Sequence, residues 1–133
     1  MVTIKRKISL DNVKVDEQLT ADEGFVNCAP RWIVTEDIGA KYGTFGYVEF
    51  PPGATHELHT HPNADEIFFV LSGHGIARSR DEIFEIGAKD TVFVPRGDVH
   101  YFRNTDEKEP LIAVFAYLGA PNLEKAGYEL EKP

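Results

Sequence analysis

Short stretches of alternating or continuous apolar residues, separated by turn-forming residues, dominate the chain from residue 46 onwards. They are rich in β-branched and aromatic side chains, a composition typical of strands. Turns containing Gly, Pro, Asn or Asp interrupt them about every ten residues, a spacing typical of an all-β sandwich or barrel. The predicted strands cover residues 46–50, 66–71, 75–78, 83–86, 91–94, 100–103 and 111–118.

The two ends of the chain follow this pattern less closely. Possible strands lie at 2–8, 13–15 and 32–35. The one helix candidate covers 122–126, where Asn122 can cap the first turn.

The length of 133 residues is enough for one domain with a substantial core. We therefore expect a single domain, 1–133, whose barrel core occupies about 45–118. Residues 1–44 would add outer strands or contact a second subunit, because an exposed strand edge is readily paired by another chain. Residues 119–133 would form a C-terminal tail.

The charge and the cysteine content exclude several classes of partner. Lys and Arg total 14 against 22 Asp and Glu, a formal net charge of −8, which disfavours nucleic acid and anionic membrane surfaces. Cys28 is the only cysteine, so no intrachain disulfide can form, and we expect a buried thiol in a reducing cytoplasm. No stretch approaches the roughly 18 apolar residues of a membrane span, and no apolar signal-peptide core is visible.

Three histidines and one glutamate are the strongest candidates for chemistry. His59 and His61 are two apart, so on a strand they point to the same face with origins roughly 6.6 Å apart. Glu66 returns after a short turn, and His100 would arrive from a distant strand. Three imidazoles and one carboxylate can surround a single divalent transition metal, and the donor set does not choose among Fe, Mn, Ni, Cu, Co and Zn. Four protein ligands would leave about two octahedral positions open.

The residues around these ligands form two spaced motifs. The first runs from Gly53 through five residues to His59, and from Glu66 through six residues to Gly73. The second runs Pro95, Gly97, His100 and Asn104, with one, two and three residues between them. Gly87 lies upstream of the second motif. Together with the ligands, the motif residues are Gly53, His59, His61, Glu66, Gly73, Gly87, Pro95, Gly97, His100 and Asn104.

This arrangement resembles the two signature motifs of the cupin superfamily, and the residues at the motif positions resemble those of the germin branch. The resemblance covers roughly residues 47–118 and implies a small single-domain cupin, a jelly-roll β-barrel with the metal near its centre. It also implies that His59, His61, Glu66 and His100 are the metal ligands. Germins are often manganese proteins linked to oxalate oxidation, but they are secreted and cysteine-bearing. The metal site is therefore the part of the resemblance that we carry over.

Strand alternation suggests neighbours of the metal. Phe68 and Val70 share the parity of Glu66, and Phe102 shares that of His100, so these three line either an apolar substrate pocket or ordinary core. Glu57 shares the parity of His59, so it is a candidate proton acceptor, unless a bulge turns it outward. Arg78 is a candidate for binding a substrate carboxylate, or it lies in solvent beside acidic residues. His56 and His74 are expected not to bind the metal.

These features predict a metal-dependent enzyme that acts on a small oxygenated organic substrate as an oxidoreductase or dioxygenase, with non-haem iron or manganese as candidate metals. A redox-neutral isomerase, lyase or decarboxylase of a sugar or small acid is the alternative, because the same ion can polarise a carbonyl. A non-catalytic small-molecule binding cupin is the third possibility. The expected partners are a small-molecule substrate and a second copy of the chain in a homodimer, with no nucleic acid and no membrane.

Overall fold

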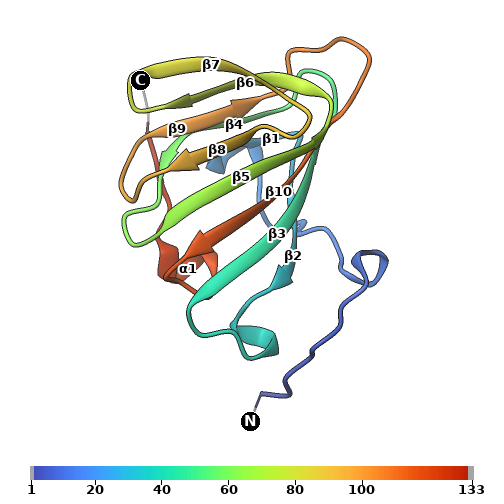
Figure 1. Cartoon of the computed structure of the whole chain (residues 1–133), viewed down its shortest axis with the longest axis vertical. Coiled ribbons are helices and arrows are strands. Elements are labelled where there is room, and N and C mark those ends of the chain that lie inside the picture. The colour runs from blue at the N-terminus through green and yellow to red at the C-terminus, as the bar shows by residue number, and fades with distance from the viewer. Residues whose placement is uncertain (1, 132–133) are drawn as a thin grey trace.

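Two antiparallel sheets face each other and enclose the core (Figure 1). The computed structural model describes residues 2–131. The first sheet has the strand order β2 (Pro30–Val34), β3 (Gly43–Phe50), β10 (Leu111–Leu118), β5 (Asp65–Ser72) and β8 (Thr91–Val94). The second has the order β1 (Phe25–Val26), β4 (Thr55–Thr60), β9 (His100–Arg103), β6 (His74–Ser79) and β7 (Glu82–Gly87), and β11 (Glu129–Leu130) also pairs with β4. This is the predicted all-β jelly-roll barrel.

Helical structure is short and lies at the ends of the barrel. Three 3-10 turns cover Leu10–Asn12, Ala21–Glu23 and Glu36–Ile38, and α1 covers Leu123–Ala126. Asn122 caps α1 as predicted, because its side chain accepts a hydrogen bond from the backbone of Lys125. Within residues 2–131, no helix has the length and apolar character needed to cross a membrane.

Alternation along the strands determines which side chains form the core. On β10, Leu111, Ala113, Phe115 and Tyr117 are buried, whereas the residues between them point to the outer face. The inward rings leave little room on the neighbouring strand: a Cβ at Gly46 would overlap the ring of Phe115. Glycine at this position therefore lets β3 carry its backbone across an aromatic core.

The N-terminal prediction is only partly correct. Residues 32–35 correspond to β2, but residues 2–8 are not in a strand, and 13–15 contribute a single bridge between Val15 and Arg31. The segment carries the like charges of 5–7 and lies extended outside the sheets in Figure 1. Residues 2–8 therefore do not form a strand, because in the described structure they pair with no sheet edge.

Candidate metal centre

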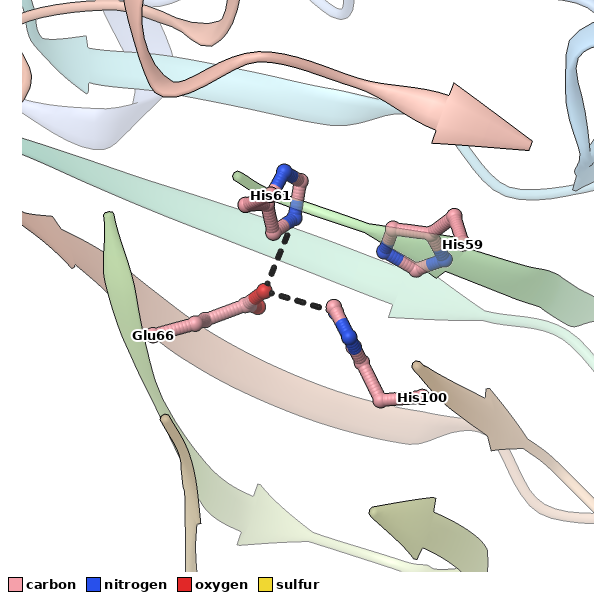
Figure 2. A group of neighbouring side chains, drawn as sticks. All are labelled: His59, His61, Glu66 and His100. Carbon is pink, nitrogen blue, oxygen red and sulfur yellow. Dashed lines mark hydrogen bonds and ion pairs between the residues drawn. The ribbon is translucent and has the colours of Figure 1, made fainter. Parts of the chain in front are cut away.

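The four predicted ligands meet inside the barrel. We call His59, His61, Glu66 and His100 the quartet. His59 lies in β4 and His61 directly after that strand, Glu66 lies in β5 and His100 in β9, and Figure 2 shows the side chains turned toward one another. One ligand atom from each lies within 4.8 Å of all the others, and all four residues are buried. The ligand set therefore joins both sheets at one point.

Backbone carbonyls orient the three imidazoles. Nδ1 of His59 lies 2.6 Å from the carbonyl of Glu57, and Nδ1 of His61 lies 2.8 Å from that of Gly127. Nδ1 of His100 lies 3.0 Å from the carbonyl of residue 98. A carbonyl oxygen can only accept, so each Nδ1 carries the hydrogen and each neutral imidazole presents an Nε2 lone pair to the centre. This is the arrangement in which histidines bind metals.

The inward atoms lack adequate partners without a cation. Glu66 Oε1 lies 3.1 Å from Nε2 of both His61 and His100, as the dashed lines in Figure 2 mark. The His61 contact does not have hydrogen-bond geometry, so the Nε2 atoms of His59 and His61 are buried without a hydrogen bond. Lone pairs facing a carboxylate repel unless a proton or a metal ion lies between them, and a buried polar atom without a partner is costly. The donor set therefore fits a divalent transition metal.

The electrostatics of the centre keep two of its ligands, His59 and Glu66, in the metal-binding protonation state. Burial, together with the charges of the other histidines, holds the pKa of His59 well below its usual value. Burial alone would raise the pKa of Glu66, but the close imidazoles of His100 and His61 outweigh burial and lower it to about 2. At neutral pH the centre therefore offers neutral imidazole at His59 and a carboxylate at Glu66, the forms that bind a metal.

A β-bulge on β4 places His56 and Glu57, which precede the ligands, on opposite sides of the sheet. The pairing of β4 with β9 shifts register between His56 and His59, so both of these imidazoles point inward although they are three apart. Their rings stack at 3.8 Å. Glu57 consequently lies on the outer side of the sheet, where its carboxylate accepts a hydrogen bond from Thr55 and lies 3.8 Å from Arg103. Glu57 therefore holds His59 with its backbone carbonyl, and its carboxylate is turned away from the metal centre.

The predicted pocket residues separate into three groups. Phe68 and Phe102 stack at 3.8 Å and line a cavity that reaches Glu66. Val70 is fully buried in the core but does not line this cavity. Arg78 lies on the outer side of β6, where its Nε donates to the carbonyl of Arg80. The prediction that Arg78 lines the pocket is wrong. Side chains alternate along β6, and the fully buried Ala77 occupies the inward position, so Arg78 points outward.

The cavity also contains residues that the sequence did not single out. Its volume is about 20 Å³, and His56 and Tyr117 line it with Glu66. Nε2 of His56 lies 3.0 Å from the hydroxyl of Tyr128, which itself donates to the carbonyl of Glu23. Since the tyrosine has one hydrogen to donate, His56 Nε2 must carry a hydrogen toward it. Only the bulge could have revealed the inward position of His56, and no sequence signal marks it.

The remaining histidine lies outside the centre. His74 is exposed, and its Nε2 lies 2.7 Å from a carboxylate oxygen of Asp106. As expected from the sequence, neither His56 nor His74 belongs to the quartet.

The chain belongs to the cupin family. It matches the family model described as a Cupin domain over residues 46–117, which includes the whole quartet. It is 36% identical over 75 residues to germin-like protein subfamily 2 member 4 of Arabidopsis thaliana, covering 53% of this chain and 34% of the relative. It is 31% identical over 101 residues to oxalate oxidase GF-3.8 of Triticum aestivum, covering 70% and 44%.

A solved structure supports the same fold. A predicted oxalate decarboxylase from Thermotoga maritima superposes with a TM-score of 0.75 and 20% identity, over 85% of this chain and 98% of that one. At this identity the likeness shows the fold alone. The chain spans between a third and a half of the length of the two curated relatives named above.

Proposed function

We propose that the protein is a metal-dependent oxidoreductase of the dioxygenase type that acts on a small oxygenated organic substrate. The observation that supports this is the convergence of three Nε2 lone pairs and one carboxylate beside a cavity. The relative from Triticum aestivum that is named an oxalate oxidase adds support for redox chemistry. Iron and manganese are the candidates that suit dioxygen chemistry, and Ni, Cu, Co and Zn also fit the donor set.

A bound metal would supply a Lewis acid for a substrate oxygen and, when redox-active, the means to react with dioxygen. The chain itself supplies the geometry. The carbonyls of Glu57, Gly127 and residue 98 fix the imidazole orientations. Phe68 and Phe102 give the cavity an apolar wall, and electrostatic interactions are stronger in such surroundings than in water.

Oxygen uptake tests this proposal. Protein loaded with Fe(II) or Mn(II) is incubated with diketones, phenolics, hydroxy acids and sugars in an oxygen-electrode chamber. We expect at least one compound to stimulate uptake, and we expect Glu66→Gln to abolish the stimulation. If the metal is bound but no compound in the panel raises oxygen uptake, the oxidoreductase proposal is contradicted.

Redox-neutral chemistry is the second candidate, as an isomerase, lyase or decarboxylase. Tyr117 favours it, because this residue places a phenol in the cavity wall beside Glu66. Burial, then the charge of Glu66, holds the pKa of Tyr117 well above its usual value, so the phenol stays neutral and can hold a proton near a substrate carbonyl. Turnover that continues unchanged without oxygen would favour this candidate. Binding without any product would indicate a non-catalytic binding protein.

The cytoplasm is the proposed location. Cys28 is buried and its thiol donates to the carbonyl of Thr55 at 3.4 Å, so the single cysteine is packed as a reduced side chain. Fractionation of cells that express the tagged protein would test this, and recovery outside the cytoplasmic fraction would contradict it.

A further inference from the structure

A groove crosses the outer face of the second sheet, where β4, β9 and β6 lie side by side (Figure 1). We call it the outer groove. Its volume of about 640 Å³ is within the range of ligand pockets, roughly 300–1,000 Å³. Six of its ten lining residues are charged: Glu57, Arg78, Arg80, Asp98, Arg103 and Glu131. The groove is therefore a large, charged site on the opposite side of the sheet from the metal centre.

Two of the six charges already neutralise each other. Arg103 stacks on the ring of Tyr101 at 3.9 Å, and its Nε donates to the hydroxyl of Thr55 at 3.3 Å. A terminal nitrogen of Arg103 lies 3.8 Å from the carboxylate of Glu57, which also accepts a hydrogen bond from Thr55 at 2.9 Å. Arg103 and Glu57 therefore form a fixed wall of the groove.

The other four charges have no partner of opposite sign within residues 2–131. No nitrogen of Arg78 or Arg80 lies within 4.0 Å of a carboxylate oxygen. The carboxylates of Asp98 and Glu131 likewise form no ion pair in this part of the chain. Arg78 and Asp98 are half-buried, so each has lost part of its hydration without gaining a counter-charge. A ligand with both kinds of charge would supply what these groups lack.

The guanidinium of Arg78 is held ready for a carboxylate. Its Nε donates to the backbone carbonyl of Arg80 at 2.6 Å, which fixes the plane of the group. The two terminal nitrogens remain able to donate in parallel to the two oxygens of one carboxylate. A side chain that is ordered before binding loses less conformational entropy when the ligand arrives.

The balance of charges disfavours simple ions. The three arginines and three acidic residues of the outer groove sum to zero net charge. A dianion would meet the carboxylates of Asp98 and Glu131, and a dication would meet Arg78 and Arg80, so each is repelled by part of the groove. Since the unpaired opposite charges are more than 4.0 Å apart, the two charges of a fitting ligand must also be separated. Two extended residues of chain span about 7 Å at most, which meets this requirement.

We propose that the outer groove binds a small zwitterion whose carboxylate and ammonium are separated by about the length of a dipeptide. Arg78 receives the carboxylate, and Asp98 with Glu131 receives the ammonium. A dipeptide and an ω-amino acid of the same backbone length share this chemistry. The site lies beyond the proposed function, because none of the quartet lines the groove.

Nuclear magnetic resonance titration tests the proposal on the full chain loaded with diamagnetic Zn(II), and again on the metal-free chain. The probes are alanylalanine and 5-aminopentanoate, whose ammonium and carboxylate are separated by the same number of bonds. We expect both to shift the backbone amide signals of Arg80, Val99 and Glu131 saturably, with the same dissociation constant with and without metal. Shifts with alanylalanine alone would assign the groove to peptides. Absence of a saturable shift with either probe would overturn the inference.

Analogues that lack one charge test the need for both. N-acetyl-alanylalanine has no ammonium, and alanylalaninamide has no carboxylate. Each should bind at least about fivefold more weakly than alanylalanine, the effect of losing one partly exposed ion pair. Equal binding of either analogue would contradict the proposal. Binding that needs the metal and shifts only the signals around the quartet would place the ligand at the metal centre and overturn it too.

Variants locate the two ends of the ligand. Arg78→Gln should weaken both zwitterions at least about fivefold, and Arg78→Lys, which keeps the charge, should restore most of the binding. Asp98→Asn combined with Glu131→Gln should weaken alanylalanine and leave N-acetyl-alanylalanine unchanged. Arg96→Ala is the matched control, because Arg96 is exposed and lies outside the groove. Natural affinity in a folded Arg78→Gln variant would overturn the inference, whereas failure of the natural chain to hold Zn(II) would bear only on the proposed function.

Discussion

Gly127 links the C-terminal segment to the metal centre. Replacing it by alanine tests its contribution to the stability of the fold and its contribution to metal affinity. Its φ is +82° and its ψ is 148°, a conformation that is nearly restricted to glycine. An added Cβ would lie 2.7 Å from two ring carbons of Pro62. Its carbonyl accepts the hydrogen bond from His61 Nδ1 at 2.8 Å. The substitution therefore both strains the backbone and displaces the group that orients a ligand.

The magnitudes follow from these contacts. The backbone conformation costs about 1–3 kcal/mol and the overlap about 1–3 kcal/mol, so we expect Gly127→Ala to lower the free energy of unfolding of the metal-free protein by about 2–6 kcal/mol. Loss of a hydrogen bond that orients a ligand typically weakens metal affinity roughly 10–100-fold. Gly53→Ala is the matched control, because Gly53 has a φ of +80° but nothing within 4 Å of an added Cβ.

Two assays separate the effects. Urea unfolding in the presence of a chelator gives the free energy of unfolding, and competition with a chromophoric chelator gives the metal affinity. Gly53→Ala should lose about 1 kcal/mol of stability, because it pays only the positive-φ cost, and keep natural metal affinity. If Gly127→Ala is destabilised as expected but binds metal as tightly as the natural chain, the Gly127 carbonyl does not position His61 and the reasoning is refuted.

Three further predictions follow from buried groups. Burial lowers the pKa of His56 from 6.5 to about 3, so between these pH values the unfolded chain binds a proton that the folded chain does not. The free energy of unfolding of the metal-free protein should therefore fall by about 1.4 kcal/mol per pH unit from this group as pH falls between about 6.5 and 3. In urea unfolding, His56→Phe should reduce this dependence of stability on pH. Burial, then the charge of Glu57, raises the pKa of Cys28 to about 12, so a chromogenic disulfide reagent at pH 8 should label it only after unfolding, and rapid labelling of the native protein would be inconsistent with this packing. Asn104 donates to the carbonyls of Phe50 and residue 109 at 2.8 Å each, so Asn104→Ala should cost roughly 2–4 kcal/mol in thermal or urea unfolding without changing metal stoichiometry.

The metal ligands could be predicted from the sequence because their positions are tied to local spacing and turn residues. His59 and His61 are neighbours on the chain, and the turn after them returns Glu66 to the same place. The positions of most strands and the inward parity of Phe68 and Phe102 followed from the same alternation.

The residues around the ligands were less accessible to prediction. A bulge on β4 broke the alternation, so His56 replaced Glu57 on the inner side. Tyr117 and Gly127 act on the centre from segments more than 50 residues away from His59 and His61. Contacts of this kind depend on tertiary packing, and a single sequence carries no local signal for them.

Metal stoichiometry tests the central claim most directly. The protein is dialysed anaerobically against Fe(II) or Mn(II), freed of excess metal, and analysed by mass spectrometry of its metal content together with His59→Ala and the control His74→Ala. We expect one metal ion per chain in the natural protein and in His74→Ala, whose imidazole is exposed outside the quartet, and a substantial loss in His59→Ala. A natural chain that binds no metal, or a His59→Ala variant that binds it fully, would contradict the account.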